Sequence, residues 1–120
     1  MAKTRPPEHY SEVKELPVEM EGADKCTIRW LLHKGKGAKN FSMRLFTIHP
    51  GGHTPYHSHD FEHEVFCVEG QGLVVIEGEE HVFEPGHYGL VPGGIMHNFV
   101  NNGPGELKFL CLIPGGGPKQ

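Results

Sequence analysis

The sequence predicts an all-β protein folded as one domain. Short runs rich in β-branched and aromatic residues recur about every eight to twelve residues, and 17 glycines and 10 prolines are spread between them as turn signals. No stretch predicts a helix longer than a turn or two. A chain of 120 residues has the length of one domain, and this pattern is typical of a β-sandwich or a closed barrel.

The expected strands follow one another from residue 25 onward. A first strand over 25–33 and a second over 41–49 are joined by a loop at 35–40, and the Pro50-Gly51-Gly52 triplet is expected to turn the chain. Further strands are expected at 64–68, 72–76, 81–83, 88–91, 95–100 and 106–113.

The two ends differ from this central part. Residues 1–24 read as a polar N-terminal tail with an edge strand at 12–20, because Pro17 cannot donate a hydrogen bond within a central strand. Residues 25–114 form the predicted barrel, and the glycine-rich residues 115–120 form a C-terminal tail.

Composition excludes several classes of function. The net charge of −4 and the absence of a basic patch argue against nucleic acid as a partner. The N-terminus has no apolar segment, so neither a signal peptide nor a membrane partner is expected. The three cysteines, with no C-x-x-C spacing, fit a reducing, cytoplasmic setting.

Residues 51–70 hold a cluster of histidines at spacings that suit metal binding. Alternate residues of an extended chain point to the same face, so His57 and His59 can aim at one point. His63 opens the next apolar run, where it shares a face with Val65 and Cys67. Neutral imidazole is the commonest metal ligand in proteins, so this stretch predicts a metal site.

A second stretch, residues 86–101, supplies a fourth histidine. Its Pro92-Gly93-Gly94 triplet is a turn signal between two short β-rich runs, and His97 lies early in the second run.

Together the two stretches resemble the paired motifs of the cupin family, G-x5-H-x-H-x3,4-E-x6-G and G-x5-P-x-G-x2-H-x3-N. The second motif matches at every fixed position, and the first departs only at its glutamate, where His63 stands. The matching residues are Gly51, His57, His59 and Gly70, then Gly86, Pro92, Gly94, His97 and Asn101. Flanking runs at 40–47 and 109–114 also resemble small manganese cupins with a four-histidine site, so the resemblance spans about residues 25–114.

This resemblance implies a single-domain cupin, a double-stranded β-helix or jelly-roll barrel. It also implies one divalent metal ion held by His57, His59, His63 and His97. Manganese is favoured by the resemblance, whereas imidazole as a ligand suits iron, nickel and zinc as well. Four neutral ligands leave the full charge of the ion, which favours an anionic substrate oxygen.

Glu64 is a rival to His63, because the motif tolerates three or four residues before its glutamate. Two observations favour His63. It lies six residues before Gly70, and it has the parity of Val65 and Cys67, whereas Glu64 would need a bulge to turn inward.

Three further residues are candidates for substrate contact. Arg44 is an anion clamp if it points inward, and the alternative is an exposed arginine on a strand face. Phe109 and Cys111 share one face of the last strand, where they either line the pocket or simply pack in the core. Asn101 is expected to brace the barrel.

Fold alone does not select the activity. The first hypothesis is a metal-dependent oxidoreductase, dioxygenase-like, acting on a small and possibly anionic organic molecule. The alternatives are a non-redox isomerase or lyase and a non-catalytic binding module. A homodimer is expected, since small barrels of this family pair and residues 12–20 look like an edge strand without a partner. Two-fold symmetry is also the commonest arrangement of identical chains.

Overall fold

The computed structural model describes residues 6–117; residues 1–5 and 118–120, the outer parts of the two predicted tails, lie outside the described range. Within it the expected all-β class is confirmed. No helix of the described chain is long and apolar enough to cross a membrane. The elements are η1 (Tyr10–Glu12), β1 (Leu16–Pro17), β2 (Asp24–Leu32), η2 (Lys34–Lys36), β3 (Phe41–His53), β4 (His63–Glu69), β5 (Gly72–Ile76), β6 (Glu79–Phe83), β7 (Tyr88–Val91), β8 (His97–Val100) and β9 (Leu107–Pro114).

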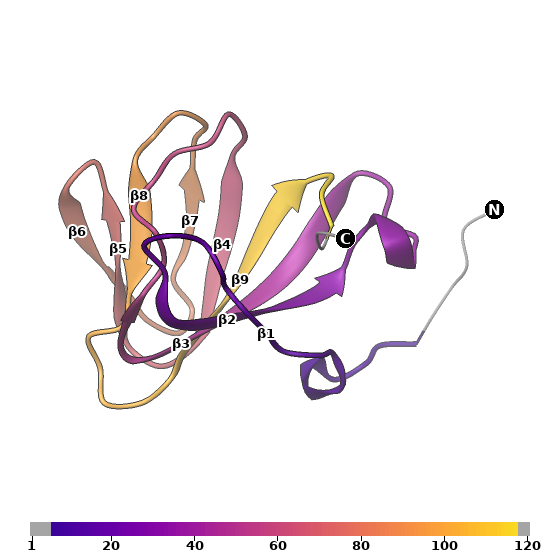
Figure 1. Ribbon diagram of the computed structural model, residues 1–120, viewed down its shortest axis with the longest axis horizontal. Helices are drawn as coiled ribbons and strands as arrows, with labels where there is room; N and C mark the ends of the chain where they lie inside the picture. Colours follow the sequence, from indigo (N-terminus) through magenta and orange to yellow (C-terminus); the bar gives the residue numbers. More distant parts are fainter. Residues whose placement is uncertain (1–5, 118–120) are drawn as a thin grey trace.

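All strand pairings are antiparallel, and the sheet curls into a nearly closed barrel (Figure 1). The strands pair in the order β6-β5-β8-β3-β9-β4-β7, with β2 on the other edge of β3 and β1 on β2. The curled sheet brings β8 and β4 near each other inside the barrel, where the ring centroids of His97 and His63 are 5.1 Å apart.

The long strand β3 departs from the expected turn at residues 50–52. The strand continues through these residues to His53, which pairs with Asp24 and Val100. Gly51 adopts a positive φ of 83° at a shift in the β2–β3 register. A side chain at Gly52 would lie 2.5 Å from the Asp24 carbonyl oxygen. The glycines therefore allow an irregular strand to pack closely, and the chain is not reversed there.

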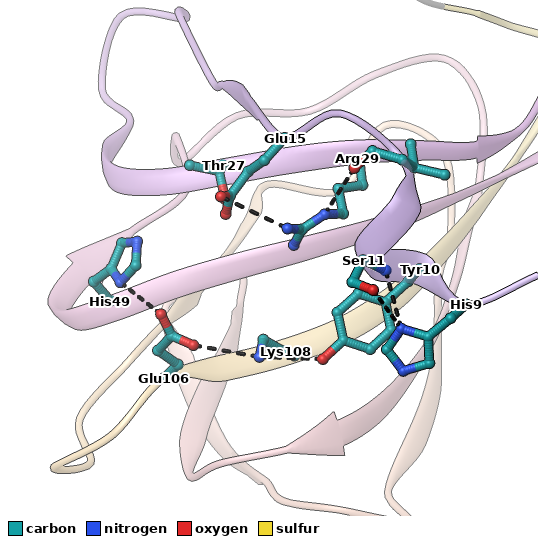
Figure 2. Close-up of polar contacts among 10 residues, drawn as sticks. His9, Tyr10, Ser11, Glu15, Thr27, Arg29, His49, Glu106 and Lys108 are labelled. Atoms are coloured by element: carbon teal, nitrogen blue, oxygen red, sulfur yellow. Dashed lines mark hydrogen bonds and ion pairs between the residues drawn. The ribbon is translucent and has the colours of Figure 1, made fainter.

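The N-terminal segment is attached to the outside of the barrel by polar contacts (Figure 2). Arg29 Nε donates to the Val13 carbonyl at 3.0 Å, and Lys108 Nζ lies 3.4 Å from the Tyr10 hydroxyl. Of the edge strand expected over 12–20, only β1 forms, and it pairs with β2 of the same chain. These contacts anchor residues 10–13 against β2 and β9.

Phe109 lies at the centre of the barrel core. It is 1% exposed, and its ring stacks on Phe99 with centroids 4.3 Å apart and on Phe46 at 5.3 Å. Asn101 closes the end of the barrel beside this core: its amide nitrogen donates to the carbonyls of Ile48 and Gly105 at 2.7 and 2.8 Å.

Candidate metal centre

The alternation of strand β4 brings His63 inside the barrel. His63, Val65 and Cys67 are buried, whereas Glu64 and Phe66 between them are exposed. The prediction that His63 shares the inward face of the strand with Val65 and Cys67 is therefore confirmed. Glu64 lies on the outer surface, so a bulge of the kind it would need to face the other histidines is not formed.

The two histidine-bearing stretches meet through a short antiparallel bridge. The backbone of His57 donates to the His97 carbonyl at 3.1 Å, and the His97 N–H donates to the His57 carbonyl at 2.9 Å. In the turn that precedes His97, the N–H of Gly94 donates to the carbonyl of His59 at 2.6 Å. A side chain at Gly93 would lie 2.3 Å from the Asp60 carbonyl, so glycine is required where the turn contacts this loop.

The four histidine rings predicted as ligands lie together. The ring centroid of His59 is 4.2 Å from that of His57, 4.6 Å from that of His63 and 5.4 Å from that of His97. One ring nitrogen from each of His57, His59 and His97 lies within 4.8 Å of the other two. These three residues form a group that could hold a metal ion, and the His63 ring lies 5.1 Å from that of His97.

The state of the His63 ring fits a metal at this position. Its Nε2 atom is buried and, within residues 6–117, has no hydrogen-bond partner. Such an orphaned polar atom is costly unless something binds it. Burial first, and then the Arg44 guanidinium, lower the pKa of His63 to about 3. Burial, followed by the charge of His57, lowers the pKa of His59 to about 4. Both rings are therefore neutral at neutral pH, as metal ligands must be.

Arg44 points inward, so the alternative of an exposed arginine is wrong. Its side chain lies between Trp30 and Phe46, with the guanidinium carbon 5.5 and 5.0 Å from the two ring centroids. Nε donates to the Cys111 carbonyl at 3.4 Å, and Nη2 donates to the Cys111 sulfur at 2.9 Å. The guanidinium thus places a positive charge beside the histidines while being held by strand β9.

A cavity of about 410 Å³ opens onto the histidine cluster. Phe109 and Cys111 line it as well as packing in the core, so both interpretations of these residues apply. Sequence reasoning missed most of the aromatic wall, which is formed by Trp30, Phe46, Phe61 and Phe99. Phe46 could have been predicted to line the cavity, because it lies two residues after Arg44 and so points to the same face of the strand. Trp30 could not, because only the pairing of β2 with β3 places it beside Arg44.

The cavity contrasts sharply in charge with the rest of the surface. Among the described residues that line it, Arg44 is the one arginine or lysine, and no aspartate or glutamate is present. A group bound here meets apolar walls, imidazoles and one guanidinium.

Comparison with known proteins agrees with this geometry. The cupin domain family matches residues 44–113, which is more than half of the chain. The chain belongs to the cupin family. The cupin is also similar to the polyketide cyclase RemF from Streptomyces resistomycificus. The two are 31% identical, with a TM-score of 0.87 and coverage of 97% of this chain and 83% of that one.

Two curated relatives match a smaller share of the chain. The cupin is 32% identical over 91 residues to an uncharacterised protein of Methanocaldococcus jannaschii, covering 73% of this chain and 72% of that protein. It is 28% identical over 85 residues to the 1-methylthio-D-xylulose 5-phosphate methylsulfurylase of Rhodospirillum rubrum. That match covers 71% of this chain and only 54% of the longer relative.

Proposed function

We propose that this cupin is a metal-dependent enzyme that acts on a small organic molecule with an apolar, aromatic body and an anionic or enolisable oxygen. His57, His59, His63 and His97 would hold one divalent ion. The observation that carries the proposal is the buried Nε2 of His63, which has no partner among the described residues, beside a group of three histidines that could hold a metal ion.

When bound, the metal supplies Lewis-acid polarisation of a carbonyl or enolate oxygen and a fixed point for orienting the substrate. Manganese remains the first candidate on the resemblance to four-histidine cupins. Iron, nickel and zinc are the alternatives, because the donor set is neutral nitrogen throughout.

The protein side chains would bind and orient the rest of the substrate. The aromatic wall suits a flat, apolar body, and it includes Phe46 and Phe109, whose ring centroids are stacked 5.3 Å apart. Arg44 would attract a carboxylate or enolate to the same end of the cavity as the histidines. Since no carboxylate of residues 6–117 lines the cavity, proton transfer would use bound water or the substrate itself.

Two reaction classes use such a site. The similarity to a polyketide cyclase over almost the whole chain favours a non-redox reaction, namely cyclisation or isomerisation of an enolisable substrate. The resemblance to manganese cupins supports the second class, an oxygen-using, dioxygenase-like oxidoreductase.

The test uses the protein loaded in turn with Mn²⁺, Fe²⁺ and Zn²⁺, offered aromatic β-diketones and linear polyketide analogues. We expect turnover under strict anaerobiosis, with a product that is an isomer or a dehydrated form of the substrate. Metal-dependent oxygen uptake in step with product formation would instead select the oxidoreductase. Absence of turnover with every metal, together with substrate binding, would reduce the protein to a binding module.

We also propose a homodimer that buries the outer face of β4 and β7. Phe66, Tyr88 and Leu90 lie on this face and are 44%, 83% and 54% exposed. Large exposed apolar groups on adjacent strands are typical of a protein interface. Light scattering at micromolar concentration should give the mass of two chains, and Tyr88→Lys combined with Leu90→Glu should give one. A wild-type monomer would contradict the dimer.

A further inference from the structure

The four histidines proposed as ligands differ in what holds their second ring nitrogen. The Nδ1 atom of His97 lies 2.9 Å from the Ile95 carbonyl oxygen. A carbonyl only accepts, so Nδ1 carries the proton and the Nε2 lone pair is free. This is the arrangement usual for a metal-binding histidine.

His63 has no carbonyl in this position. Its Nδ1 lies 3.0 Å from the sulfur of Cys111 and 3.3 Å from Nη2 of Arg44. A guanidinium can only donate. If Nδ1 accepted from Arg44, the ring proton would sit on Nε2, which is buried without a partner and could not then bind a metal. Of the two neighbours, only the sulfur can accept the Nδ1 proton.

We propose that Cys111 is a positioning residue for His63. Its sulfur accepts the Nδ1–H of His63, so that the Nε2 lone pair faces His57, His59 and His97. Arg44 donates to the same sulfur at 2.9 Å and to the carbonyl of the same residue, so it orients the thiol group. This inference rests on the metal site proposed above.

The sheet places these three side chains on one face of three neighbouring strands. Cys111 pairs with Arg44 of β3 on one side and with Val65 of β4, two residues from His63, on the other. The exposed fractions of Cys111, His63 and Arg44 are 2%, 5% and 8%. Water therefore has little access to replace the sulfur as acceptor.

The first test reads the position of the proton in the metal-free protein. Long-range ¹H–¹⁵N correlation spectra at neutral pH should show wild-type His63 with its proton on Nδ1. In Cys111→Ala the proton should move to Nε2, because Arg44 becomes the only partner of Nδ1. A wild-type ring with the proton on Nε2, or a ring unchanged in Cys111→Ala, would overturn the proposal whether or not the protein binds metal.

The second test measures Zn²⁺ affinity by competition with a chromogenic chelator. Partners that orient a ligand histidine are worth about 10- to 100-fold in metal affinity, and we expect a loss of this size in Cys111→Ala. Cys111→Ser should recover part of the loss, because a hydroxyl oxygen also accepts. Cys67→Ala is the matched control: Cys67 is 0% exposed, and its sulfur contacts the Glu69 and Phe83 carbonyls. Its affinity should equal that of wild type.

A double-mutant cycle separates this proposal from the metal site on which it rests. His63→Ala combined with Cys111→Ala should bind Zn²⁺ no more weakly than His63→Ala alone. If His63→Ala binds like wild type, the assignment of His63 as a ligand fails. If His63→Ala loses affinity while Cys111→Ala matches Cys67→Ala, the ligand assignment stands and the role of Cys111 is overturned.

Discussion

His63→Ala should lower the affinity for Mn²⁺ or Zn²⁺ by more than about 100-fold, since even groups that only orient a ligand are worth about 10- to 100-fold. Glu64→Ala should leave the affinity unchanged, because that carboxylate is on the outer face of β4. Competition titration with a chromogenic chelator measures both. The pair is closely matched, since the two positions adjoin on one strand.

Loss of folding would imitate loss of a ligand, because His63 is buried. His63→Gln, which keeps most of the volume, and far-UV circular dichroism of each variant control for this. His63→Glu should retain metal but lower the charge of the site, which should ease oxidation of bound Mn or Fe. A metal stripped by Glu64→Ala and retained by His63→Ala would refute the four-histidine site.

Acid should release the metal well below the reference histidine pKa of about 6.5. From that reference value alone, release is expected on mild acidification. The structure moves this expectation to lower pH for two of the rings, because the pKa of His59 is lowered to about 4 and that of His63 to about 3. Protons therefore compete with the metal for these two rings only near those values. Burial and the neighbouring His97 also lower the pKa of His57.

Metal release followed against pH should be steep, since several protons replace one ion. Potentiometric counting of protons taken up per ion released checks the steepness. A gradual release with a slope of one proton would mean fewer histidine ligands. Release complete at mildly acidic pH in a protein that is still folded would contradict the lowered pKa values.

The same pKa shifts make the metal-free protein acid-sensitive. Unfolded histidine binds a proton near pH 6.5, whereas folded His59 and His63 stay neutral down to about pH 4 and about pH 3. Between these limits the unfolded state binds more protons. The free energy of unfolding should therefore fall as pH drops from about 6.5 and level off below about 3. Thermal unfolding of the metal-free protein, measured as a function of pH, would show this range. His63→Gln should narrow the pH range over which the free energy of unfolding falls, because the group with the lowest pKa is removed.

Much of the fold and of the histidine cluster could be predicted because strand alternation is a local property. The parity that places His63 with Val65 and Cys67, and Glu64 on the other face, follows from a period of two residues. That period holds along β4 wherever the strand lies in the barrel. Turn signals at Pro92-Gly93-Gly94 are equally local.

Other features depend on chain segments distant in sequence. The triplet at residues 50–52 has the composition of a turn, but it continues β3 because pairing with Asp24 and Val100 outweighs that local preference. The expected edge strand at 12–20 shortened to β1 for a similar reason: hydrogen bonds from Arg29 and Lys108 hold the preceding residues outside the sheet.

The sequence by itself determined that this chain is an all-β cupin whose four motif histidines can converge, because motif spacing and strand parity are written along the chain. Only the tertiary structure decided what surrounds them. It joined His57 to His97 through a backbone bridge, placed Trp30 over Arg44, and set the Cys111 sulfur against His63. The Trp30–Arg44 contact arises from the pairing of β2 with β3, and the Cys111–His63 contact from the pairing of β9 with β4. The register of these pairs is set by packing across the whole barrel and not by any local stretch of sequence.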